Sequence, residues 1–169
     1  MVIKHCPYCD GCTANVLNDS GVSCDGGGNL ATNALFVLPS ANHAEQVDDL
    51  KAIYEETTGK PFLENCYYKF AVACKTKGNY DVFNSAINYC RSVLYTEYVK
   101  IHPKHTFVFG DAYKVFYKDK PHFQHIPFMI GNYEYWLHFY PSLGIKHHCD
   151  VRYSSLKGNL AHDIIKYNV

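Results

Sequence analysis

Five cysteines in the first 90 residues have the residue type and spacing to hold a metal centre. Cys9 and Cys12 form a Cys-x2-Cys pair, with Cys6 three residues before it as an alternative ligand. Cys74 and Cys90 form a second pair with 15 residues between them. Zinc sites favour short spacing in both ligand pairs, whereas iron–sulfur clusters accept irregular separations, so the pattern favours a [4Fe–4S] cluster over zinc. Unmetallated buried thiols are the remaining interpretation.

Length and composition predict one globular domain. The chain has 169 residues, of which 47% are hydrophobic, so we expect a single domain over 1–169 with a cysteine-rich N-terminal segment at 1–30. It contains no run of 18 apolar residues and no apolar leader, so we expect it to be neither secreted nor membrane-spanning, and to lie in the cytoplasm, or in that of a host if the chain is viral. Thiols in that compartment are metal ligands or buried groups more often than disulfides. The buried-thiol interpretation is preferred for Cys24, Cys66 and Cys149.

The charge is unevenly distributed along the chain, although its net value is zero. Residues 1–99 hold 7 Lys/Arg against 11 Asp/Glu, whereas residues 100–169 hold 9 against 5, together with eight of the ten histidines. The C-terminal part is therefore the more basic one. This supports contact with phosphates without requiring it.

The elements that must position reactive residues alternate between strands and helices. Strands are expected at Ala34–Leu38, Tyr67–Ala73 and Thr106–Phe109, and within Tyr133–Tyr140. Helices are expected at Gln46–Thr57 and Val82–Ile101, in a short stretch capped by Asp111, and from Ser154 or Ser155 onward. This order predicts an α/β fold, a three-layer α/β/α sandwich around a mostly parallel four-stranded sheet. Ligands bind at the carboxyl ends of such strands, where the loops begin at Pro39, Cys74, Gly110 and Pro141.

Several segments also stand in the order found in a known family. They are the Cys-x2-Cys start, Gly28-Asn29 eight residues before Val37, the strand ending in Cys74, the helix bearing Cys90, and Ile101-His102-Pro103-Lys104 leading into Phe107-Val108-Phe109-Gly110-Asp111-Ala112. In these motifs, from about Cys9 to the end, the chain resembles family 4 uracil-DNA glycosylases. The resemblance implies a uracil-DNA glycosylase-like fold in which four cysteines hold a [4Fe–4S] cluster. It also implies a protein that binds DNA, flips out a nucleotide and hydrolyses its N-glycosidic bond.

The first of two functional loops departs from the family pattern. The family loop reads like G-E-x-P-G and positions a water and the base, but here the carboxylate position is Pro39 and the glycines are absent. Asn42 or His43 can orient a water instead, because an amide or an imidazole accepts a hydrogen bond; the alternative is that both are turn residues. Ser40 is expected to contact DNA.

The second loop keeps its frame but changes its first residue. The family reads like H-P-S-x-L, and here the histidine is replaced by Tyr140. A phenol can still donate to a developing oxyanion, and His138 lies on the same strand face. Leu143 is the expected apolar wedge, and its neighbours Pro141 and Ser142 are expected to contact DNA beside it. Lys146, His147 and His148 are the expected phosphate contacts. The alternative is a solvated loop.

Two functions of different classes follow from these departures. In the first, the shortened loops make room for a modified or non-standard pyrimidine, and the protein is a DNA glycosylase. In the second, loss of the motif carboxylate, the motif histidine and the motif asparagine, which is Phe70 here, leaves a catalytically inactive factor, viral or antiviral, that binds DNA or a protein partner. A nuclease acting at abasic or damaged sites is a weaker third, because the clustered carboxylates of metal-dependent phosphodiester chemistry are missing.

Overall fold

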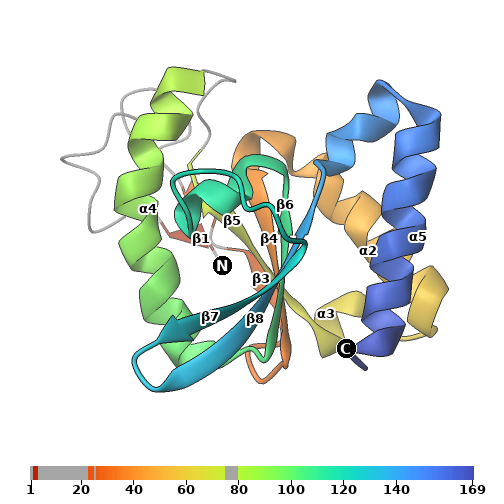
Figure 1. Cartoon of the computed structure of the whole chain (residues 1–169), viewed down its shortest axis with the longest axis horizontal. Coiled ribbons are helices and arrows are strands. Elements are labelled where there is room, and N and C mark those ends of the chain that lie inside the picture. The colour runs from red at the N-terminus through yellow and green to blue at the C-terminus, as the bar shows by residue number, and fades with distance from the viewer. Residues whose placement is uncertain (1, 4–22, 25, 75–79) are drawn as a thin grey trace.

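The structure is a computed structural model that describes residues 2–3, 23–24, 26–74 and 80–169 (Figure 1). It has an α/β fold with a mixed sheet in the middle. The six strands of this sheet are β3 (Gly27–Gly28), β4 (Ala34–Ser40), β5 (Tyr67–Val72), β6 (His105–Phe109), β7 (His125–Ile130) and β8 (Tyr133–Tyr140). Their spatial order is β3-β5-β4-β6-β8-β7. A separate antiparallel pair joins β1 (Val2–Ile3) to β2 (Ser23–Cys24).

The four strands expected from the sequence are the parallel centre of this sheet. β5, β4, β6 and β8 pair in parallel, and β3 and β7 add antiparallel edges. The prediction of a four-stranded sheet was therefore wrong in the number of strands. β3 consists of two glycines, and β7 contains Pro127 and leaves part of its length exposed, so neither edge carries the continuous apolar signal of a buried strand.

Helices cover both faces of the sheet. They are α2 (Glu45–Thr58), α3 (Phe62–Asn65), α4 (Tyr80–Ile101) and α5 (Asp150–Lys166), with the 3-10 turns η2 (Ala41–His43), η3 (Gly110–Val115) and η4 (Leu143–His147). Figure 1 shows α4 against one face and α2 with α5 against the other. The helix expected after Asp111 is a 3-10 turn, and the terminal helix begins at Asp150, earlier than predicted. None of the described helices combines the length and apolar character needed to cross a membrane.

Burial on both faces explains the uninterrupted apolar run in β4. Leu35 and Val37 pack into the apolar cluster beneath α4, whereas Phe36 and Leu38 pack into the cluster beneath α2 and α5. Alternate side chains of a strand point to opposite faces, so a central strand between two helical layers needs apolar residues at every position. The helices and the sheet thereby hold the strand ends, and the loops after them, in fixed places.

Candidate functional site

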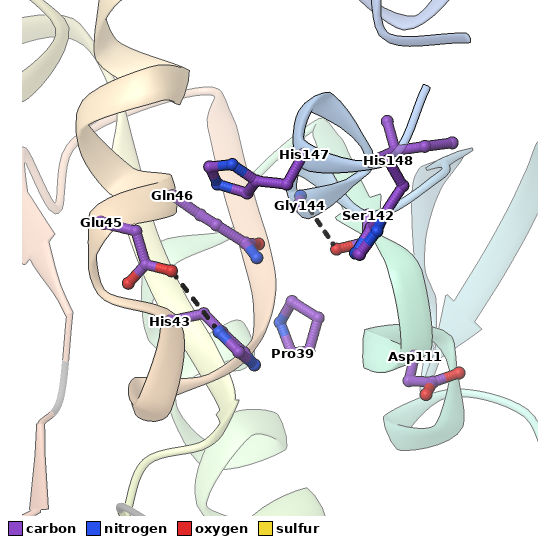
Figure 2. Close-up of a pocket in the computed structure, with 10 residues that line it drawn as sticks. Pro39, His43, Glu45, Gln46, Asp111, Ser142, Gly144, His147 and His148 are labelled. Carbon is purple, nitrogen blue, oxygen red and sulfur yellow. Dashed lines mark hydrogen bonds and ion pairs between the residues drawn. The ribbon is translucent and has the colours of Figure 1, made fainter. Parts of the chain in front are cut away.

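An open cleft of about 640 Å³ lies where β4, β6 and β8 end (Figure 2). This volume is within the usual range for small-molecule sites, and the carboxyl ends of parallel strands are where such sites form. The lining residues come from three strand ends and from the helical segments beside them: Pro39, His43, Glu45, Gln46, Asp111, Ser142, Gly144, Ile145, His147 and His148. The cleft therefore brings together segments more than 100 residues apart in the chain.

Gly110 lets the three strand ends meet. Its φ is +52°, and a Cβ placed there would lie 3.0 Å from Ser142 Cβ and 3.4 Å from Pro39 Cγ. Any other residue would both strain this backbone conformation and push the loops apart. Ser142 then caps η4 by accepting a hydrogen bond from the Gly144 N–H at 3.2 Å.

The Gln46 side chain is the most informative group in the cleft. Gln46 is only 5% exposed, and its Oε1 has no hydrogen-bond partner among the described residues. Figure 2 shows its amide pointing into the cleft. An unpaired buried amide oxygen costs about 1–3 kcal/mol, which a bound ligand with a hydrogen-bond donor would recover. A hydrogen-bond donor that reaches this oxygen, on a ligand or on a water, would therefore be favoured at this point.

An imidazole and a carboxylate form a pair at the entrance to α2. His43 Nδ1 lies 3.5 Å from Glu45 Oε1. A carboxylate that holds one ring nitrogen orients the imidazole and directs its other nitrogen, Nε2, to a proton transfer. Asp111 adds a second carboxylate from the β6 end of the same cleft. The side chains of His43 and Glu45 are 53% and 60% exposed, so a ligand entering the cleft can reach both.

Three of these groups were missed by sequence reasoning. Asp111 was assigned only to a helix cap, and Glu45 and Gln46 were not selected at all. A usable signal did exist, because all three closely follow strands that run parallel in the sheet. The carboxylate absent at Pro39 thus has counterparts nearby that come from other positions in the chain.

Of the residues selected in the first loop, His43 lies in the cleft and Ser40 is buried. Ser40 is 4% exposed, and its Oγ accepts a hydrogen bond from the Asn42 N–H at 3.1 Å. Ser40 therefore acts as the cap of η2 and is not accessible to DNA, and the backbone of Asn42 takes part in that turn.

The residues selected in the second loop also lie partly in the cleft and partly in the core. Ser142, His147 and His148 line the cleft. Leu143 is fully buried in the apolar cluster under α2 and α5, so it cannot wedge into DNA and that expectation is corrected. Lys146 Nζ pairs with Asp49 Oδ1 at 2.5 Å, and this hydrogen bond raises the pKa of Lys146. Its charge is compensated within the protein.

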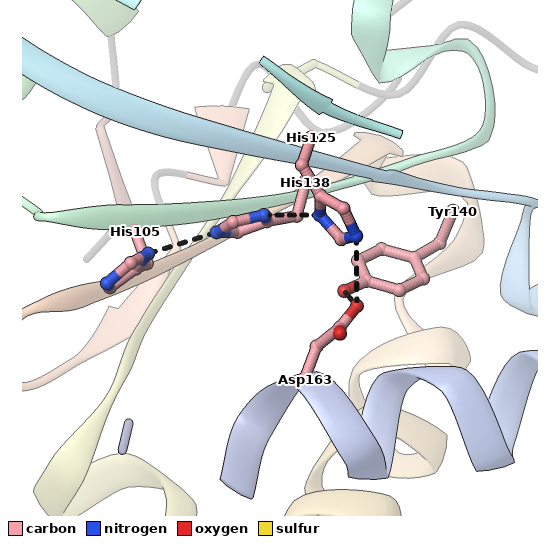
Figure 3. Close-up of polar contacts among 5 residues, drawn as sticks. All are labelled: His105, His125, His138, Tyr140 and Asp163. Carbon is pink, nitrogen blue, oxygen red and sulfur yellow. Dashed lines mark hydrogen bonds and ion pairs between the residues drawn. The ribbon is translucent and has the colours of Figure 1, made fainter. Parts of the chain in front are cut away.

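Tyr140 and His138 do not line this cleft. Tyr140 is 5% exposed and donates to Asp163 Oδ2 at 2.5 Å, and burial followed by this hydrogen bond raises the pKa of Tyr140 (Figure 3). His138 is fully buried beside it in the sheet. Both side chains face α5 in the core, which puts them out of reach of a reacting atom in the cleft. Tyr140 and the adjacent Pro141 instead contribute to the lining of a separate cavity.

His138 is the centre of a buried histidine chain. Its Nε2 lies 3.0 Å from His105 Nδ1, and its Nδ1 lies 2.8 Å from His125 Nδ1. Burial lowers the pKa of His138 to about 3, with further lowering from His105, His125 and Lys166, so the ring is neutral and must donate through one nitrogen and accept through the other.

Asp163 lies at one end of this chain. Its Oδ2 is 4.0 Å from His125 Nε2, which is within ion-pair distance but too long for a hydrogen bond. With the His125 N–H on Nε2, His125 Nδ1 accepts from His138, and His138 Nε2 accepts from His105. The chain joins β6, β8, β7 and α5.

Only some of the cysteines lie among the described residues. Cys6, Cys9 and Cys12 lie outside them. Cys74 is buried and Cys90 is half-buried, and both pack in the apolar cluster beneath α4. Among the described residues, no group of three or more His, Cys, Asp or Glu side chains is arranged to hold a metal ion. Cys66 is fully buried, as expected of a core cysteine, and this burial raises the pKa of its thiol to about 11.

Comparison with known proteins does not supply a family for the chain. No protein-family model matches it, and no curated protein matches it. The function is therefore inferred from the geometry of the cleft together with the sequence motifs.

Proposed function

We propose that the protein is a DNA glycosylase that binds a flipped-out, non-standard pyrimidine in the cleft and hydrolyses its N-glycosidic bond. The observation that carries this proposal is the buried amide of Gln46, whose Oε1 has no hydrogen-bond partner among the described residues, in the same cleft as the His43–Glu45 pair. The motif resemblance to family 4 uracil-DNA glycosylases supports the same reaction class. An α/β fold with its cleft at the strand ends suits such a site but does not specify it.

Recognition of the base follows from the chemistry of an amide. A pyrimidine presents neighbouring donor and acceptor groups on its Watson–Crick edge, and enzymes that flip bases read this edge by hydrogen bonds. The Gln46 carboxamide offers one acceptor and two donors, so it can pair with two adjacent groups at once. Because the cleft is open at its rim, a substituent on the opposite edge of the ring can remain outside it.

The reaction requires a water, a base for its proton and stabilisation of separated charge. In the proposed step, His43 Nε2 takes a proton from a water while Glu45 holds Nδ1. The water oxygen bonds to the sugar C1′, the C1′–N bond breaks, and its electron pair leaves with the base. Asp111 stabilises the positive charge that develops on the sugar, and His147 or His148 donates to the departing base.

We also propose a [4Fe–4S] cluster, held by Cys9, Cys12, Cys74 and Cys90 with Cys6 as an alternative ligand. Support comes from the positions of Cys74 and Cys90, which both belong to the apolar cluster beneath α4 and so lie on the same side of the sheet. Such a cluster would stiffen the α4 side of the fold and take no part in the reaction. Anaerobically purified protein should be brown and contain iron. The iron content should be lower in Cys74→Ser and in Cys90→Ser. A colourless protein that holds zinc would contradict the proposal.

Base release tests the glycosylase directly. Single-stranded and duplex DNA carrying uracil, 5-hydroxymethyl or glycosylated pyrimidines is incubated with the protein, and released bases are measured by mass spectrometry. Gln46→Leu, which keeps the size but removes the amide, and His43→Ala should each reduce release at least about 100-fold, the typical contribution of such groups. His162→Ala, an exposed histidine on α5 outside the cleft, is the matched control and should keep full activity.

The binding-only alternative has its own supporting observation. Tyr140, His138 and Leu143 are all held in the core, so the second loop offers fewer groups for chemistry than its motif suggests. The same experiment separates the functions. Tight DNA binding with no released base would refute the glycosylase and support an inactive binding factor, and cut strands with no released base would identify a nuclease.

A further inference from the structure

A second cavity of about 300 Å³, the flanking cavity, lies beside the cleft. Gly110 and Pro141 line it, whereas the residues that follow them, Asp111 and Ser142, line the cleft. Gly110 lies against Ser142, since a Cβ on Gly110 would be 3.0 Å from Ser142 Cβ. The two cavities therefore lie on either side of two dipeptides in contact, Gly110-Asp111 and Pro141-Ser142.

The flanking cavity differs from the cleft in its chemistry. The cleft contains the carboxylates of Glu45 and Asp111, but none of the described residues lining the flanking cavity is acidic. Lys120 contributes a positive charge, and His122 contributes a ring N–H. Phe123, which is 76% exposed, places an aromatic face at the same wall. A cation beside an exposed aromatic ring is the combination that binds a phosphate and an unstacked base.

The wall that carries these groups is anchored to the sheet. It leads directly into β7, and the Phe139 N–H of β8 donates to the Gln124 carbonyl at 2.9 Å. Asn159, on α5, closes the opposite side with an amide. Rigid placement lowers the entropy cost of binding a flexible strand.

We propose that the flanking cavity binds the nucleotide next to the flipped one and that the protein acts on single-stranded DNA. Phe123 stacks on the neighbouring base, and Lys120 and His122 contact its phosphate. In a duplex both faces of that base are covered by its neighbours, so stacking on Phe123 requires single-stranded or locally melted DNA. This inference rests on the proposed function, because it places the flipped base in the cleft.

Binding of labelled oligonucleotides tests the inference. Fluorescence anisotropy is measured with a single strand of about 10 nucleotides and with the same sequence as a duplex. This length is within the range that one single-strand-binding domain covers. Phe123→Ala should weaken single-strand binding about 10-fold, a typical loss for one stacked base, whereas Phe123→Tyr should restore it. Lys120→Ala should reduce the slope of log K against log salt by about 0.7, the value for one phosphate contact on a single strand.

The control removes a lysine elsewhere. Lys157 is an exposed residue of α5 that lies over the Tyr153 ring and outside both cavities, so Lys157→Ala should leave the salt slope unchanged. Equal loss of slope in both lysine variants, or unchanged binding in Phe123→Ala, would overturn the inference. So would duplex binding as tight as single-strand binding.

The two proposals fail in distinguishable ways. If the wild type releases no base but Phe123→Ala and Lys120→Ala still weaken single-strand binding, the flanking cavity stands and the glycosylase does not. If base is released while both variants bind like the wild type, the glycosylase stands and the flanking cavity does not.

Discussion

Protonation of His138 provides a quantitative test of the buried histidine chain. The side chain is fully buried, and its burial, with the neighbouring His105, His125 and Lys166, lowers its pKa from 6.5 to about 3. Asp163 is the one carboxylate of this group, and it contacts the chain at the His125 end. Below pH 6.5 the unfolded chain therefore takes up a proton at this position that the folded chain does not.

The sign and size of the effect follow from linkage. Stability is highest above pH 6.5 and falls as the pH is lowered toward 3, because the unfolded state binds more protons in that window. Each pH unit changes the free energy of unfolding by about 1.4 kcal/mol once the unfolded imidazole is fully protonated. It is half protonated at pH 6.5, so lowering the pH by about two units from 6.5 costs about 2 kcal/mol.

We test this by urea unfolding of the wild type and of His138→Phe at both ends of the two-unit window. The measured quantity is the change in the free energy of unfolding between the two pH values. Surface carboxylates titrate alike in both proteins, so they cancel in the difference. We expect the wild type to lose about 2 kcal/mol more than the variant between the two pH values. Parallel losses, or a His138 ring that titrates near pH 6.5 by NMR, would show that the buried chain is charged and would refute the assignment of its donors and acceptors.

Four further substitutions test the packing by urea unfolding. Glu97→Gln should destabilise the protein by about 3–5 kcal/mol, because it removes the carboxylate that pairs with the buried ammonium of Lys69, and Lys69→Met in the same chain should recover much of the loss; an additive double variant would contradict this. Gly59→Ala should cost only about 1 kcal/mol, because this left-handed cap of α2 has open space around it. Gly110→Ala should cost more, since its Cβ would also press on Ser142, and it should reduce ligand binding in the cleft; equal costs at the two glycines would argue against close contact of the loops.

Much of the fold could be predicted from local sequence patterns. The apolar run of β4 and the helical spacing of α2 and α4 locate these elements to within a few residues. Edge strand β7 could not be found in this way, because it is partly exposed and interrupted by Pro127. A local pattern reports burial, and an edge strand is defined by its hydrogen bonds to a neighbour.

The candidate site was less predictable than the fold. His43, Ser142, His147 and His148 were selected from their loops, and all four line the cleft. Tyr140 and His138 were selected by the same reasoning but lie in the core. Position in a motif shows which loop a residue is near, but it does not show whether the side chain turns outward or into a neighbouring helix.

Local sequence patterns indicated the alternating elements, the helical layers and the loops where chemistry is expected, because apolar periodicity and turn residues act over short stretches of chain. The meeting of Gln46, Glu45 and Asp111 in one cleft, and of His105, His125 and His138 in one chain, became apparent from the tertiary structure alone. These groups come from separate strands and helices, and their proximity depends on strand order and on close approaches such as that of Gly110 to Ser142. Such contacts have no local signature in the sequence.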